Sequence, residues 1–187
     1  PGASPVHGTG PALPHMVDGQ TLCLACHDKT ANPSGTPSCT TGPEHGEARG
    51  QGCVACHMPT VPGPSGAVST RAQHASHAFP GAHAAWRGDP SFLASGLGVT
   101  AAFDGGALTV TLVNRAGHAF PTGFPARFAS VRVRGLDAGG TERWTNAGPD
   151  GALPPEALLN KVYVDDEGRP TLAPFSTRLE RDNRPKP

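Results

Sequence analysis

The sequence has little of the material from which a protein core is normally built. Apolar residues make up 36% of its 187 residues, and aromatic residues only 5%. Glycine and proline are instead abundant, at 25 and 21 residues, a proportion close to that of low-complexity sequence. We therefore expect sparse regular secondary structure and a thin core of side chains, so that another group must supply buried apolar bulk.

An excess of charge of either sign is also missing. Fifteen basic residues balance fifteen acidic ones, which disfavours electrostatic binding to nucleic acid or to an anionic membrane surface. No apolar run reaches the roughly 18 residues of a membrane span, so we expect no transmembrane helix. Because the sequence opens at Pro1 rather than at methionine, we expect a processed or trimmed chain.

Two copies of one cysteine pattern are present: Cys23-Leu24-Ala25-Cys26-His27 and Cys53-Val54-Ala55-Cys56-His57. C-x-x-C-H is the attachment signature of c-type haem. Two thiols three residues apart lie on one side of a helical turn, so both can bond the vinyl-derived carbons along one haem edge. The histidine that follows can give its imidazole to the iron as the proximal ligand. The sequence thus predicts two covalently attached haem c groups with their irons.

Other uses of paired cysteines compete with this interpretation. The four thiols could bind one structural zinc, although the 26 residues between Cys26 and Cys53 exceed the usual ribbon spacing and a ribbon needs no histidine after each pair. A thioredoxin-like motif requires a βαβ context, which these glycine- and proline-rich surroundings do not offer. Disulfides are the remaining alternative. The double occurrence of C-x-x-C-H favours haem over all three.

Histidine is in excess, and eight of the nine lie in the first 83 residues. With His27 and His57 as proximal ligands, seven remain for two distal positions. Of the two methionines, Met58 is too close to its own motif to cross the haem plane. We therefore expect two His ligands at each iron. The pairing of distal ligands stays open among His7, His15, His45, His74, His77, His83 and His118.

Iron with both axial positions filled has no vacant site for a substrate, which favours electron transfer over catalysis. The alternative is a haem enzyme, a peroxidase or an oxyanion reductase, with one open distal site and an acid or base above it. No acidic residue or arginine is placed by a recognisable motif for that task. We expect an electron carrier and not an enzyme.

The composition changes near residue 90, and we predict two domains. Residues 1–90 should form a mostly irregular, haem-wrapped region with short helices at the two motifs and a loop over 59–66. Residues 91–187 should form a small antiparallel β-sandwich, because β-rich runs alternate there with turn signals such as Asp104-Gly105-Gly106. We predict strands at 97–103, 107–114, 128–136, 141–145, 161–164 and 178–180, and a short helix at 155–159.

Two stretches resemble multihaem c-type cytochromes. Gly52-Cys53-Val54-Ala55-Cys56-His57-Met58-Pro59 resembles the C-x-x-C-H-M-P haem region of that family. Asn114-Arg115-Ala116-Gly117-His118-Ala119-Phe120-Pro121-Thr122-Gly123 is similar to the G-H-x-x-P-T-G signature of the β-sandwich that many of those cytochromes carry. The likeness spans roughly residues 20–185.

The resemblance implies electron transfer to other redox proteins or extracellular acceptors, at the cell surface or outside the cell, with the periplasm as the alternative. By the same likeness, His45 and His77 match distal iron ligands. His118 matches the signature histidine, which is either a ligand or a structural imidazole. Some family members polymerise into extracellular filaments, so self-association into a conductive homopolymer is a further expectation.

Three features depart from the family pattern. Two haems are few for it. The sandwich also stops at Pro187 where similar domains continue, so either the chain is trimmed or the sandwich is incomplete and a partner strand could complete it. Cys39 has no pairing partner in the two motifs. It is a bare thiol, an intermolecular bridge or a small buried apolar residue.

Overall fold

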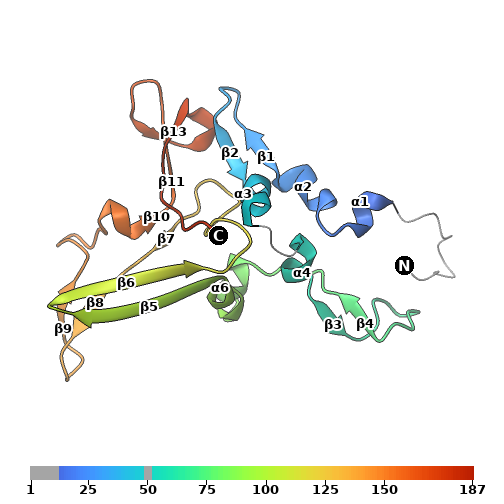
Figure 1. The fold of residues 1–187 in the computed structure, drawn as a ribbon, viewed down its shortest axis with the longest axis horizontal. Helices are drawn as coiled ribbons and strands as arrows, with labels where there is room; N and C mark the ends of the chain where they lie inside the picture. Colours follow the sequence, from blue (N-terminus) through green and yellow to red (C-terminus); the bar gives the residue numbers. More distant parts are fainter. Residues whose placement is uncertain (1–12, 49–51) are drawn as a thin grey trace.

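The computed structural model describes residues 13–48 and 52–187, and Figure 1 shows them as short elements joined by long irregular connections. The N-terminal half carries short helices, most of them one or two turns long. They are α1 (Pro14–Val17), α2 (Thr21–His27), α3 (Thr41–Ala48), α4 (Cys53–His57), α5 (Ala82–Trp86) and α6 (Ser91–Gly96).

Strands pair antiparallel in small sheets. The N-terminal hairpins are β1 (Lys29–Ala31) with β2 (Pro37–Thr40) and β3 (Thr60–Pro62) with β4 (Gln73–Ala75). Further along are the pairs β5 (Leu97–Asp104) with β6 (Ala107–Asn114), β7 (Ala129–Ser130) with β10 (Leu158–Leu159), and β8 (Arg134–Leu136) with β9 (Glu142–Thr145). A three-stranded sheet has the order β12 (Pro170–Thr171), β11 (Lys161–Val164), β13 (Arg178–Asp182), with 3-10 turns η1 (Pro155–Ala157) and η2 (Ala173–Phe175) nearby. This is the predicted class of an irregular helical region followed by small antiparallel sheets.

The β5–β6 hairpin confirms the prediction from the Asp104-Gly105-Gly106 turn. Its strands pair in continuous register from Leu97↔Asn114 to Asp104↔Ala107. Gly105 and Gly106 have φ angles of 54° and 82°, in the left-handed region that a two-residue hairpin turn needs and that glycine adopts without strain.

Three predictions are wrong in detail. Residues 60–62 of the predicted loop form β3, because Val61 pairs with His74 across the hairpin. The predicted strand 128–136 is interrupted at 131–133, where its partners change: Val131 N–H donates to the Ala157 carbonyl and Val133 N–H to the Asn146 side chain. The predicted helix 155–159 is only the turn η1, since its last two residues form β10 against β7.

The core is as thin as the composition predicts. Among the described residues, the buried apolar side chains are Ala119, Ala157, Leu159, Tyr163, Val164 and Ala173. Large apolar side chains such as Trp86 and Phe103 stay 92% and 74% exposed.

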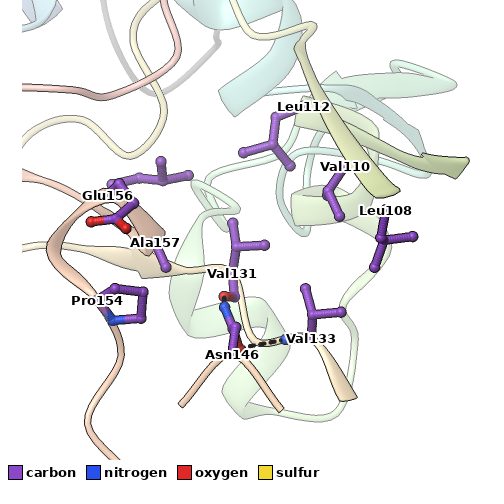
Figure 2. A pocket seen from close by; sticks show the side chains of 10 residues that line it. Leu108, Val110, Leu112, Val131, Val133, Asn146, Pro154, Glu156 and Ala157 are labelled. Atoms are coloured by element: carbon purple, nitrogen blue, oxygen red, sulfur yellow. Dashed lines mark hydrogen bonds between the residues drawn. The ribbon is translucent and has the colours of Figure 1, made fainter. Parts of the chain in front are cut away.

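An open groove of about 370 Å³ separates β6 from the segment 131–133. The alternating residues Leu108, Val110 and Leu112 line one side of it, and Val131 and Val133 line the other (Figure 2). This face of β6 therefore points into the groove, with Val110 and Leu112 half-buried and Leu108 exposed.

Polar contacts join the N-terminal region to the C-terminal strands. The buried Lys161 ammonium donates to the Thr40 hydroxyl at 2.7 Å, and the Tyr163 hydroxyl donates to the Pro37 carbonyl at 3.1 Å. The side-chain amide of Asn32 donates to the carbonyls of Ala173 and Ser176. These hydrogen bonds join the two predicted domains across the expected boundary at residue 90. The division there remains a prediction.

Helices in the described ranges are all too short or too polar to cross a bilayer.

Candidate haem-binding centre

Both C-x-x-C-H motifs form short helices that end at their histidine. In α2 the Asp28 N–H donates to the Leu24 carbonyl at 3.1 Å, and in α4 the Met58 N–H donates to the Val54 carbonyl at 2.9 Å. Cys26 and Cys56 are exposed, while Cys23 and Cys53 are half-buried. One helical turn between the two thiols of each motif leaves both available to the same flat ligand, as the spacing predicts.

The two motifs meet at their N-terminal ends. The Val54 N–H donates to the Gly19 carbonyl at 3.2 Å, so the start of α4 lies against the residues before α2. The side chains of Cys53 and Cys23 are within hydrogen-bonding reach, and burial followed by this neighbour raises the pKa of the Cys53 thiol. None of the five cysteines, all of which lie in the described ranges, is in a disulfide.

The zinc alternative finds no support in this arrangement. Across residues 13–48 and 52–187, no three His, Cys, Asp or Glu side chains gather as they would around a single metal ion. The four motif thiols therefore do not form the tetrahedral set that a structural zinc requires.

His57 is held by its surroundings in one orientation. Its Nδ1 lies 2.9 Å from the Pro80 carbonyl, which can accept only if Nδ1 carries the proton. Nε2 then keeps its lone pair, which is the tautomer that a metal-ligating histidine needs. The Phe92 ring lies edge-on beside it, with centroids 5.4 Å apart.

His118 faces the same region from the loop that follows β6. Its Nδ1 lies 3.0 Å from the Ala119 carbonyl, so its Nε2 is also left with a lone pair. The rings of His57 and His118 are nearly parallel, with an interplanar angle of 18° and centroids 6.2 Å apart. Burial, helped by the nearby His57 and His45 rings, lowers the pKa of His118 despite the opposing Ala119 carbonyl and Glu44. The neutral imidazole, which is the ligand form, is therefore favoured.

The separation of these two rings fits one iron between them. Two metal–imidazole bonds of about 2 Å, each extended by about 1 Å from nitrogen to ring centre, place the centroids about 6 Å apart. The observed centroid separation of 6.2 Å equals this length, and the contacts at both Nδ1 atoms leave each Nε2 able to bind. The residues present thus fit a haem: Cys53 and Cys56 would attach it, and His57 and His118 would each give an imidazole to its iron.

The remaining predicted ligands lie in different settings. The His45 ring lies beside Gly117, where a Cβ would come within 3.2 Å of its Cδ2. His77 is exposed with its Nδ1 3.1 Å from the Ala75 carbonyl, and half-buried His74 has its Nδ1 2.9 Å from the Gly63 carbonyl. His27 is exposed at the end of α2. The structure therefore brings His57 and His118 together, with His45 near His118, and places His74 and His77 on or next to β4.

Other histidines and Cys39 complete the candidates. His15 on α1 and His83 on α5 are exposed, and His7 lies outside the described residues. Cys39 is half-buried, with its Sγ 3.5 Å from the Thr41 hydroxyl and 4.0 Å from the His27 carbonyl.

Two charged residues near His118 were not identified from the sequence. Glu44 on α3 and Arg184 after β13 are 5% exposed each and form an ion pair of 2.6 Å. Burial would raise the pKa of Glu44, but hydrogen bonds from Thr40, Thr122 and Arg184 outweigh it and hold the pKa below its ordinary value. No sequence signal could have paired them, because 140 positions separate the two residues.

Comparison with known proteins supports a cytochrome fold. No protein-family model matches the sequence, and no curated protein matches it. The crystal structure of a penta-haem cytochrome c552 from Thermochromatium tepidum is similar over 93% of this chain, with a TM-score of 0.75 and 29% sequence identity. This chain spans 43% of that protein's chain. The resemblance to multihaem c-type cytochromes is therefore confirmed at the level of the fold.

Proposed function

We propose that this chain is a dihaem electron-transfer unit of the multihaem cytochrome type, and not an enzyme. The single observation that carries the proposal is the pair of near-parallel imidazoles of His57 and His118, 6.2 Å apart. A position between two such rings, next to a C-x-x-C-H motif, suits iron with both axial sites filled. Bound haem supplies one-electron chemistry at its iron.

The chain's own residues hold the two groups in defined roles. Cys23 and Cys26 attach the first haem and His27 is its proximal ligand. Cys53, Cys56 and His57 do the same for the second, and His118 is the distal ligand there. The distal ligand of the first iron is proposed from His45 and His77, the candidates that the family likeness implies.

The contact between Cys23 and Cys53 supports transfer between the two groups. Each of these thiols is proposed to carry the edge of a separate haem, and the two edges would therefore be attached at neighbouring points. A short distance between redox groups is what an electron carrier needs, whereas an enzyme site needs access for substrate.

The thin core supports the same conclusion. Side chains such as Trp86 and Phe103 remain largely exposed, and the buried apolar residues of the described chain are few and mostly small. Two flat macrocycles would supply the apolar bulk that the composition lacks.

The test is spin-state spectroscopy of the haem-loaded chain. In the parent protein, electron paramagnetic resonance of the oxidised state should show low-spin iron only. His118→Ala should convert one haem equivalent to high-spin iron, and the reduced variant should bind one more equivalent of carbon monoxide than the parent. Glu180→Gln, which removes an exposed carboxylate from β13, is the control and should change neither signal.

Two results would overturn the proposal. Low-spin iron at both haems of His118→Ala would remove His118 as a ligand. A high-spin signal in the oxidised parent, with turnover of hydrogen peroxide or nitrite, would instead favour the haem-enzyme alternative.

We further propose that the chain acts at the cell surface or outside the cell, receives electrons from other redox proteins, and associates with copies of itself. The absence of net charge removes long-range repulsion between copies, and the exposed apolar side chains of the β5–β6 hairpin, Val99, Phe103, Leu108 and Val113, offer contact area. Electron microscopy of native material should show polymers; a stable monomer would reject self-association.

A further inference from the structure

The loop that carries His118 is fixed by a buried charged cluster. One carboxylate oxygen of Glu44, Oε2, accepts from the Ala119 N–H at 3.2 Å and from the Thr122 hydroxyl at 2.7 Å. The other, Oε1, accepts from the Thr40 hydroxyl at 2.6 Å and from Arg184 Nη2 at 2.6 Å. Half of the donors to this buried carboxylate thus belong to the four residues that follow His118.

Arg184 holds the same loop from the other side. Its Nη1 donates to the Pro121 carbonyl at 2.8 Å, while Nε and Nη2 donate to Asp182 at 2.7 and 2.8 Å. The next residue, Pro185, accepts from the Phe120 N–H at 3.0 Å, and the Asn114 amide donates to the carbonyls of both His118 and Pro185. The loop is therefore tied to α3 and to the C-terminal segment at once.

Stability alone is a poor explanation for this arrangement. Moving a carboxylate and a guanidinium out of water is unfavourable, so a buried ion pair is often no more stabilising than apolar residues of the same size. What the pair does provide is geometry, because a fully hydrogen-bonded buried network has one arrangement. Every loop group that the pair contacts lies within residues 119–122, directly after the proposed ligand.

We propose that Glu44 and Arg184 are positioning residues for His118: they hold the loop so that its imidazole lies opposite His57. This inference rests on the proposed function, in which His118 binds the iron of the second haem. The two residues act through the Ala119 N–H, the Pro121 carbonyl and the Thr122 hydroxyl, without contact to the iron. Outer-shell partners of a metal-bound histidine typically change metal affinity about 10- to 100-fold.

The test uses the haem-loaded full chain with Glu44→Gln. The amide keeps the size of the side chain but removes the charge opposite Arg184 and places an N–H donor where only acceptors fit. We expect cyanide, which competes with the distal histidine, to bind about 10- to 100-fold more tightly at one haem. A high-spin fraction at that haem should accompany it in the oxidised state.

Two further variants make the result specific. Glu180→Gln removes an exposed ion pair with Arg178 on β13 and should leave cyanide affinity and spin state unchanged. Thr122→Val removes one loop donor to Glu44, together with the hydroxyl contact to Thr41 at 2.9 Å, but keeps both charged side chains. It should also raise cyanide affinity. It decides the question if Glu44→Gln does not fold.

The outcomes separate the two proposals. If His118→Ala produces high-spin iron but Glu44→Gln and Thr122→Val bind cyanide like the parent, the positioning role is wrong and the ligand assignment stands. If His118→Ala leaves both irons low-spin, the ligand assignment itself has failed, and the positioning role with it.

Discussion

Each C-x-x-C-H helix is followed at once by an antiparallel hairpin, and the two hairpins have different surroundings. The β1–β2 hairpin after α2 is bound to the C-terminal strands through Asn32, Lys161 and Tyr163. The hydrogen bonds of β3–β4, after α4, stay within that hairpin and its flanks among the described residues. In Figure 1, β1–β2 lies close to β13, whereas β3–β4 extends away from the other sheets.

The haem motifs differ in the same way. His27 ends its helix exposed, while His57 is fixed by the Pro80 carbonyl and lies opposite His118. One local pattern used twice thus acquires two roles through its long-range contacts. The hairpin that follows the first motif is held by hydrogen bonds to the C-terminal region. In the second motif it is His57 itself that is held, by the Pro80 carbonyl, and it lies opposite His118.

Removing the motif cysteines should have the largest effect. Cys53→Ala with Cys56→Ala, and separately Cys23→Ala with Cys26→Ala, should each lower the intact mass by one haem, because thioether attachment needs the thiols. The first pair should lower Tm more, since the second haem would join α4 to the distant His118 loop. Cys39→Ala is the control and should retain both haems; equal masses for all variants would refute the haem assignment.

Gly19→Ala should disturb the contact between the two motifs. Gly19 has a φ of 79°, and a Cβ there would lie 3.0 Å from Val54 Cγ2. Gly35 has the same φ of 79° with nothing within 4 Å. Both substitutions impose backbone strain of about 1 kcal/mol, so the excess loss of unfolding free energy in Gly19→Ala, about 1–3 kcal/mol, measures the contact. Equal losses would mean that the motifs do not depend on each other here.

The stabilisation that Tyr163 gives through its hydrogen bond to Pro37 in the β1–β2 hairpin should decrease at high pH. Burial raises the pKa of Tyr163 from its ordinary value of 10.0 to about 12. As the pH rises above 10, the unfolded state loses this proton before the folded state does. The contribution of Tyr163 to the free energy of unfolding is therefore complete below pH 10 and falls by at most about 3 kcal/mol as the pH rises to about 12. Chemical denaturation across this range should show the slope in the parent and a smaller one in Tyr163→Phe. A slope unchanged by the substitution would assign it to other groups.

Hydrogen exchange should detect the smallest difference. Amides of β1–β2 should exchange more slowly than those of β3–β4, because opening the first hairpin also breaks its bonds to Ala173, Ser176 and Tyr163. Mass spectrometry of peptides covering 29–40 and 60–75 provides the measurement. Asn32→Ala should reduce the difference in exchange rate between the two hairpins. Faster exchange in β1–β2 of the parent would contradict the comparison.

Local chemistry made part of the fold predictable. Gly105 and Gly106 set the β5–β6 turn, so this hairpin could be predicted from the sequence. Strand β3 escaped prediction because Thr60-Val61-Pro62 reads as loop sequence and is a strand only through its partner β4. The break at 131–133 could not be predicted either. It lies where the pairing partner changes from β10, which pairs with β7, to β9, which pairs with β8.

The candidate site likewise has a part set by local sequence and a part set by long-range contacts. The sequence by itself was enough to predict haem attachment, because both thiols and the histidine of each motif lie within five consecutive residues and one helical turn sets their geometry. Only the tertiary structure decided that His118, rather than any other spare histidine, lies opposite His57, and that Glu44 and Arg184 hold its loop. Those contacts join residues 61 to 140 positions apart, and no local rule determines which distant side chains a folded chain will bring together.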